Sequence, residues 1–139
     1  MTIQERVDEY KSDFDLFDEP NDKLEYIFDL GKAHEGLASE EKTEETRVVG
    51  CASDAWLVCE CNHGVMHLRG EGTSEMAKGM MVLLLSIFSE RTPEEILNFN
   101  PEALHDMGIV ELLSPVRQQS LEAFLSKVYG YAKQCSAVN

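Results

Sequence analysis

Residues 55–69 read AWLVCECNHGVMHLR, and this stretch decides the fold. Residues 55–61 are apolar and typical of a β-strand. Residues 62–64 (Asn-His-Gly) have the composition of a turn, and residues 65–69 return as a second strand. The pattern predicts an antiparallel β-hairpin in which alternate residues of each strand face opposite sides.

A helical pattern precedes the hairpin. Pro20 breaks an acidic N-terminal segment, and Asn21 or Asp22 can cap a second helix that runs to about residue 38. The apolar side chains of this helix recur at helical spacing: Leu24, Ile27, Phe28 and Leu30.

Helical patterns also follow the hairpin. Thr73 or Ser74 can cap a long apolar helix, residues 92–95 (Thr-Pro-Glu-Glu) form a capping box, and residues 114–115 (Ser-Pro) open the last helix. This order of elements predicts one α+β domain over residues 1–139. We expect a small antiparallel β-sheet with helices packed on one face.

Composition excludes several classes of partner. The net charge of −14 leaves no basic surface for nucleic acid and disfavours an anionic membrane. The most apolar stretch, residues 79–88, is about half as long as a membrane span. We therefore expect neither nucleic acid nor membrane among the partners.

The compartment predicts the state of the cysteines. Residues 1–10 are polar and acidic, which is not the pattern of a secretory signal, so the cytoplasm is the expected location. In that compartment Cys51, Cys59, Cys61 and Cys135 are expected to be thiols rather than disulfides.

Cys51 is the first candidate for chemistry. It follows Gly50 and precedes Ala52 and Ser53, and small neighbours allow a tight turn and let another molecule approach the thiol. A reactive cysteine also needs a stabilised thiolate, and Arg47 is the nearest cation in sequence. From context alone, a structural cysteine at a strand end remains the alternative.

Cys59 and Cys61 form the second candidate. Alternate residues of a strand share a face, so the two thiols point the same way, and His63 follows them at the turn. With Cys51 or His67 they could supply four ligands for zinc. The alternative is that Cys59 packs toward the helices and Cys61 ends the hairpin.

The segment around Cys51 resembles a known family. Residues 49–56, VGCASDAW, are similar to the motif of the SufE/CsdE family, the sulfur acceptors of cysteine desulfurases. Further similar segments follow in order over nearly the whole chain: residues 74–79 (SEMAKG), 92–99 (TPEEILNF) and 113–121 (LSPVRQQSL).

The resemblance implies a fold shared with IscU-type iron–sulfur scaffolds and a carrier rather than an enzyme. Cys51 would accept persulfide sulfur from a pyridoxal-phosphate cysteine desulfurase, which the carrier stimulates. The sulfur would then pass to an iron–sulfur scaffold complex, with no resident cofactor or metal. Cys59 and Cys61 are not part of the family motif, so a zinc- or cluster-binding scaffold stays open as the alternative.

The carrier role also suggests supporting residues. Gly50, Ala52 and Ser53 suit a hinge that turns Cys51 inward when idle and outward when docked. We expect Trp56 to pack beneath this loop and Arg117 to anchor it by hydrogen bonds.

Overall fold

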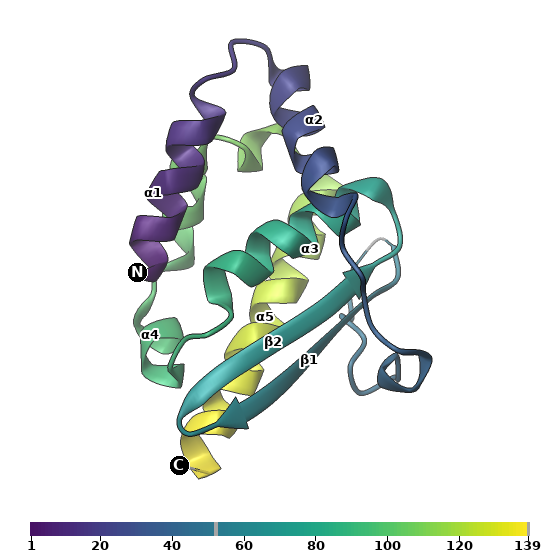
Figure 1. Cartoon of the computed structure of the whole chain (residues 1–139), viewed down its shortest axis with the longest axis vertical. Helices are drawn as coiled ribbons and strands as arrows, with labels where there is room; N and C mark the ends of the chain where they lie inside the picture. The colour runs from purple at the N-terminus through teal and green to yellow at the C-terminus, as the bar shows by residue number, and fades with distance from the viewer. Residues whose placement is uncertain (52, 139) are drawn as a thin grey trace.

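The computed structural model describes residues 1–51 and 53–138 (Figure 1). Within these residues the chain forms α-helices, short 3-10 helices (η) and one β-hairpin. In chain order the elements are α1 (Ile3–Phe14), α2 (Pro20–Gly31), η1 (Ser39–Glu41), β1 (Ala55–Asn62), β2 (Val65–Gly72), α3 (Glu75–Phe88), α4 (Pro93–Asn98), η2 (Pro101–Met107), η3 (Val110–Leu112) and α5 (Pro115–Val138). The predicted α+β class is confirmed.

The hairpin has the register that its sequence demands. Its pairs run from Ala55 opposite Gly72 to Asn62 opposite Val65. His63 and Gly64 turn the chain with φ values of 54° and 76°, the left-handed geometry of a two-residue hairpin turn.

Strict alternation gives the hairpin two different faces. The inner face carries Ala55, Leu57, Cys59 and Cys61 on β1, with Leu68 opposite Cys59. Figure 1 shows α3 and α5 lying behind the hairpin, so the inner face meets helices. This is the predicted arrangement of a small sheet covered on one face.

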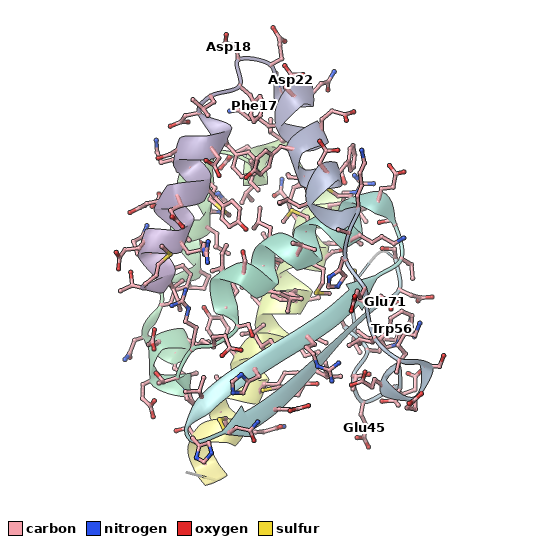
Figure 2. The ribbon with its side chains drawn as sticks, in the orientation of Figure 1. Phe17, Asp18, Asp22, Glu45, Trp56 and Glu71 are labelled. Atoms are coloured by element: carbon pink, nitrogen blue, oxygen red, sulfur yellow. A yellow bond between two sulfur atoms is a disulfide. The ribbon has the colours of Figure 1, made fainter. Side chains whose placement is uncertain are left out.

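The outer face holds the segment that connects α2 to β1. Lys42 ties this segment to the sheet: its Nζ lies 3.0 Å from Glu71 Oε2 and 5.5 Å from the centre of the Trp56 ring. The backbone N–H of Leu37 donates to Glu71 Oε1 at 2.8 Å. Figure 2 shows Trp56 and Glu71 beside the loop that carries Glu45.

The predicted limits of the second helix are wrong. Pro20 begins α2 rather than preceding it, because proline fits the first helical turn, where no backbone N–H is needed. The helix ends at Gly31, not near residue 38. After Gly31 the chain bonds to the hairpin instead of continuing the helix: His34 Nε2 lies 2.7 Å from the Gly70 carbonyl oxygen on β2.

The later helices begin where the sequence predicts. Ser74 Oγ accepts from the Ala77 N–H and caps α3, and Thr92 forms a capping box with Glu95 at the start of α4. No helix in the described part of the chain is long and apolar enough to cross a membrane.

One core joins all the layers. The largest fully buried side chains come from α1, α2, both strands, α3, α4 and the segment after it: Phe14, Ile27, Leu57, Met66, Leu83, Ile87, Phe88, Ile96, Leu104, Met107 and Ile109. α5 adds Leu121, Phe124 and Val128 to the same cluster. The core therefore links the hairpin to the helices at both ends of the chain.

α2 and α3 cross at two glycines. A Cβ at Gly31 would lie 2.7 Å from the Gly79 nitrogen, and a Cβ at Gly79 would overlap the carbonyl oxygen of Ile27. The backbones approach this closely because neither residue has a side chain.

Gly79→Ala should therefore destabilise the fold by about 2–4 kcal/mol, since α2 must move away from α3. Gly130→Ala is the matched control: it also replaces a helical glycine, but apart from the adjoining backbone of its own helix no described atom would lie within 4 Å of the added Cβ. We expect this control to stabilise by about 0.5–1 kcal/mol through helix propensity. Urea unfolding measures both changes, and equal effects would contradict the close crossing.

Candidate functional site

Cys51 lines a largely apolar cavity of about 180 Å³. The cavity lies among the Cys51 loop, the start of β1 and the first turns of α3 and α5. Its walls are Val48, Cys51, Ser53, Ala55, Ser74, Met76, Ala77, Met80, Met81, Leu84, Leu113, Arg117, Ser120, Leu121 and Phe124. Cys51 itself is partly exposed, so its thiol belongs to both the cavity and the surface.

Backbone hydrogen bonds fix both ends of the Cys51 loop. The Val48 N–H donates to the Ala55 carbonyl at 2.8 Å, and the Thr73 N–H donates to the Asp54 carbonyl at 3.2 Å. Between these ties Gly50 has a φ of 98°, which favours glycine because other residues are strained there. The loop is thus held at its ends and turns at a glycine.

The structure brings together some of the predicted site residues. Ser53 and Arg117 line the same cavity as Cys51. Gly50 faces α5, where a Cβ would lie 3.5 Å from the Cβ of Ala123. Ala52 lies outside the described residues.

Trp56 is not placed beneath the Cys51 loop as expected. Strand alternation puts its side chain on the outer face of the hairpin, opposite to the buried Ala55 and Leu57. There it pairs across the strands with Glu71 and lies under Lys42. The tryptophan therefore holds the segment before β1, and it does not line the cavity.

Arg117, not Arg47, is the cation of the cavity. Arg47 forms ion pairs with Asp54 at 3.3 Å and Glu44 at 4.0 Å. Arg117 lies in the first turn of α5 and lines the cavity. The backbone N–H of Arg117 donates to Ser114 Oγ, just before the helix begins. Proximity in sequence favours Arg47, and only the fold brings Arg117 to the cavity that Cys51 lines.

The starts of two helices add to the positive charge that Arg117 contributes to the cavity. Ser74 and Ala77 of α3 line the cavity together with the opening turns of α5. The first N–H groups of a helix carry a partial positive charge, which stabilises anions nearby. A negatively charged sulfur in this cavity would therefore lie near one guanidinium and near the starts of two helices.

Sequence reasoning missed most of the cavity walls. Met76, Met80 and Met81 face the cavity from α3, and Leu113 and Phe124 face it from the last part of the chain. Each of these residues has the apolar character of a core position. Nothing in the sequence distinguishes a residue that fills the core from one that borders a gap in it.

The expectation that all four cysteines are thiols is wrong. Cys61 and Cys135 form a disulfide across 74 residues, with 5.8 Å between their Cα atoms. The expectation rests on the reducing conditions of the cytoplasm, whereas the distance between the two cysteines is set by the fold. The end of β1 packs against the last turns of α5, which brings Cys61 and Cys135 together. Cys51 and Cys59 are the free cysteines.

Cys59 is a poor nucleophile at neutral pH. Burial, with a smaller contribution from the neighbouring Glu60 carboxylate, raises the pKa of its thiol to about 11. The thiolate is the reactive form of cysteine, so Cys59 is mostly in its unreactive form.

The zinc site considered for Cys59 and Cys61 is not assembled. Among the described residues no group of three or more His, Cys, Asp or Glu side chains could hold a metal ion. Cys61 bonds to Cys135, and His67 Nδ1 lies 2.7 Å from Glu90 Oε1. His63 is exposed at the hairpin turn.

Comparison with known proteins identifies the family. A family model described as SufE, Fe-S metabolism associated domain, matches residues 8–132. An uncharacterised SufE-like protein of Rhizobium etli is 30% identical over 132 residues, which cover 91% of this chain and 89% of that protein.

A solved structure shares the fold. The solution structure of a hypothetical protein from Thermus thermophilus matches with a TM-score of 0.76 and 17% sequence identity, covering 95% of this chain and 96% of that one. This likeness concerns the fold alone, whereas the family match extends over most of the sequence. The chain therefore belongs to the SufE family, whose domain is associated with Fe–S metabolism.

Proposed function

We propose that this protein is a sulfur carrier for iron–sulfur cluster assembly. It accepts the sulfane sulfur of a persulfide from a pyridoxal-phosphate cysteine desulfurase onto Cys51, stimulates that enzyme and passes the sulfur to a scaffold complex. The observation that supports this most is the placement of Cys51, a free and partly exposed cysteine in the wall of a largely apolar cavity that Arg117 also lines.

Transfer to Cys51 is an exchange between sulfur atoms. The Cys51 thiolate attacks the outer sulfur of the desulfurase persulfide, and a bond forms between Cys51 Sγ and that sulfur. The original sulfur–sulfur bond breaks, and the desulfurase cysteine leaves as a thiolate. No external oxidant or reductant is consumed, and no resident cofactor is required in the carrier.

The cavity suits the storage of one extra sulfur. A water molecule takes about 30 Å³ in the liquid, so a space of about 180 Å³ has room for the added atom. Its apolar walls keep small charged reductants away from the persulfide. Arg117 and the two helix starts stabilise the negative charge that the thiolate or persulfide carries.

Delivery requires the sulfur to leave the cavity. Gly50, with its positive φ, provides a turning point in a loop that is tied at Val48 and Asp54. With Ala52 and Ser53 it would let Cys51 face inward when idle and outward when docked.

Exposed apolar side chains flank the Cys51 loop and its cation. Val49 is 81% exposed and precedes Gly50, and Val116 is 53% exposed and precedes Arg117. Such residues suit contact with a partner protein better than contact with water. The partners we propose are the desulfurase and a downstream scaffold complex, in the cytoplasm, and neither nucleic acid nor membrane.

The first test is Cys51→Ser. After incubation with a desulfurase and cysteine, the wild-type protein should gain the mass of one sulfur atom, and the variant should gain none. Thermal unfolding should change little, because Cys51 lies at the edge of a cavity rather than in the packed core. Cys59→Ser is the matched control and should accept sulfur normally. Labelling of Cys51→Ser at the wild-type level would rule out the site.

Arg117→Gln tests the electrostatic part of the site. Loss of the cation should slow persulfide transfer to Cys51 about tenfold, since one charge-assisted interaction contributes about 1–2 kcal/mol. Arg47→Gln removes a cation that pairs with Asp54 and Glu44 and should leave the rate near that of wild type. Single-turnover kinetics with a persulfide-loaded desulfurase measures both rates, and equal slowing would assign the effect to net charge alone.

The gated loop predicts a change in thiol reactivity. In the free protein Cys51 should react slowly with a bulky alkylating agent, because the cavity shields one side of the thiol. Binding of a desulfurase whose nucleophilic cysteine is replaced should accelerate the reaction several-fold. Peptide mass spectrometry reports the rate at Cys51. A fast rate that the partner leaves unchanged would contradict gating and leave the carrier role intact.

A further inference from the structure

We propose that Cys61 and Cys135 form a redox-responsive clamp on the C-terminal turns of α5. Low-molecular-weight thiols open it and low-molecular-weight disulfides close it, so that the end of the helix is released from the hairpin or fixed to it. The proposal does not depend on sulfur transfer at Cys51, because it rests on a different pair of cysteines at the other end of α5.

The clamp joins the end of β1 to the last turns of α5. Cys61 lies on the inner face of β1, one residue before the strand ends. Cys135 lies in the last turns of α5, and Figure 1 shows the C-terminal end of this helix beside the closed end of the hairpin. Cys135 is only 2% exposed, so its sulfur is enclosed between the two elements.

The last turns of α5 pack on the hairpin as far as Cys135. Tyr131 Oη donates to the Leu57 carbonyl at 2.6 Å, and Ala132 is fully buried. Beyond Cys135, residues 136 and 137 are exposed. The disulfide therefore lies close to the exposed end of the described helix, and helix ends fray readily unless they are tied down.

The two sulfurs differ in access, which gives the exchange a direction. Cys61 is partly exposed and Cys135 is buried. A reductant thiolate attacks Cys61 Sγ, a mixed disulfide forms there, and Cys135 leaves with the electron pair of the broken bond and takes up a proton. A second thiolate attacks the small-molecule sulfur of the mixed disulfide and releases Cys61. Two small thiols are oxidised to one disulfide while the protein disulfide becomes two thiols, and the reverse reaction closes the clamp.

Cys59 is the competitor in this exchange. It lies on the same strand face as Cys61, two residues away, and could attack the disulfide and change the pairing. Burial holds the pKa of its thiol at about 11, which keeps the attacking thiolate scarce at neutral pH. The clamp therefore opens to external thiols without rearranging internally.

Opening the clamp should also lower thermal stability. A bond across 74 residues restricts the unfolded chain, and its loss favours unfolding. We expect the Tm of the reduced protein to be roughly 10 °C below that of the oxidised protein.

The test uses the full chain carrying Cys51→Ser, equilibrated in buffers of varied reduced to oxidised glutathione ratio. Intact mass should show the loss of two hydrogens on oxidation, and alkylation mapping should show protection of Cys61 and Cys135 together. Hydrogen exchange should speed up on reduction in residues 131–137 and change little in residues 121–128, which serve as an internal control. The Tm should follow the same ratio.

Two further variants make the result decisive. Cys61→Ser should have the low Tm in every buffer, and Cys59→Ser should keep the full redox response. A disulfide that contains Cys59, or free Cys61 and Cys135 under oxidising conditions, would overturn the pairing. If the Cys61–Cys135 disulfide survives excess reduced glutathione and opens only to dithiothreitol, it is a static crosslink and the redox response is contradicted. If reduction changes neither the hydrogen exchange of residues 131–137 nor the Tm, the disulfide does not hold the end of α5 and the proposal is wrong.

Discussion

The fold depends on the burial of one face of a hairpin that could not stand alone. An isolated pair of antiparallel strands is only marginally stable in water, because its backbone groups pair but its apolar face remains exposed to solvent. Here Leu57 and Met66 on that face are fully buried. Tyr131 donates from α5 to the Leu57 carbonyl at 2.6 Å, which fixes the helix along the strand. This attachment also places the first turns of α5, at the other end of the helix, so that Arg117 lines the same cavity as Cys51.

The parts of the fold that the sequence predicts are those with local causes. Asn62-His63-Gly64 demands a hairpin, Ser74 and Thr92 cap the helices that follow them, and each is found in that role. The end of α2 has no local cause. Residues near 32–38 could continue a helix, but bonds from His34 and Leu37 to β2 outweigh that preference. Likewise, strand alternation alone places Trp56 on the outer face of the hairpin, away from the position beneath the Cys51 loop that the carrier role suggests.

The candidate site divides in the same way. Cys51 and its small neighbours can be identified from the sequence and from the family resemblance. The cavity cannot, because its walls come from segments as distant as Val48, Met80 and Phe124, and because a gap depends on how the side chains pack. The disulfide was also beyond sequence reasoning. A chain with four cysteines allows several pairings, and only the contact of β1 with α5 selects Cys61 and Cys135.

The proposed carrier role raises a chemical problem in a chain with four cysteines, and this arrangement addresses it. A persulfide on Cys51 is open to attack by any available thiolate, including those of its own chain. Cys61 and Cys135 are bonded to each other and hold no thiolate while the bond is closed. Burial raises the pKa of the Cys59 thiol to about 11, so little of it is thiolate at neutral pH. Both states follow from the packing of α5 on β1, which encloses Cys135 and desolvates Cys59. The helix that contributes Arg117 to the cavity of Cys51 thus also limits competition from the other cysteines for as long as the disulfide is closed.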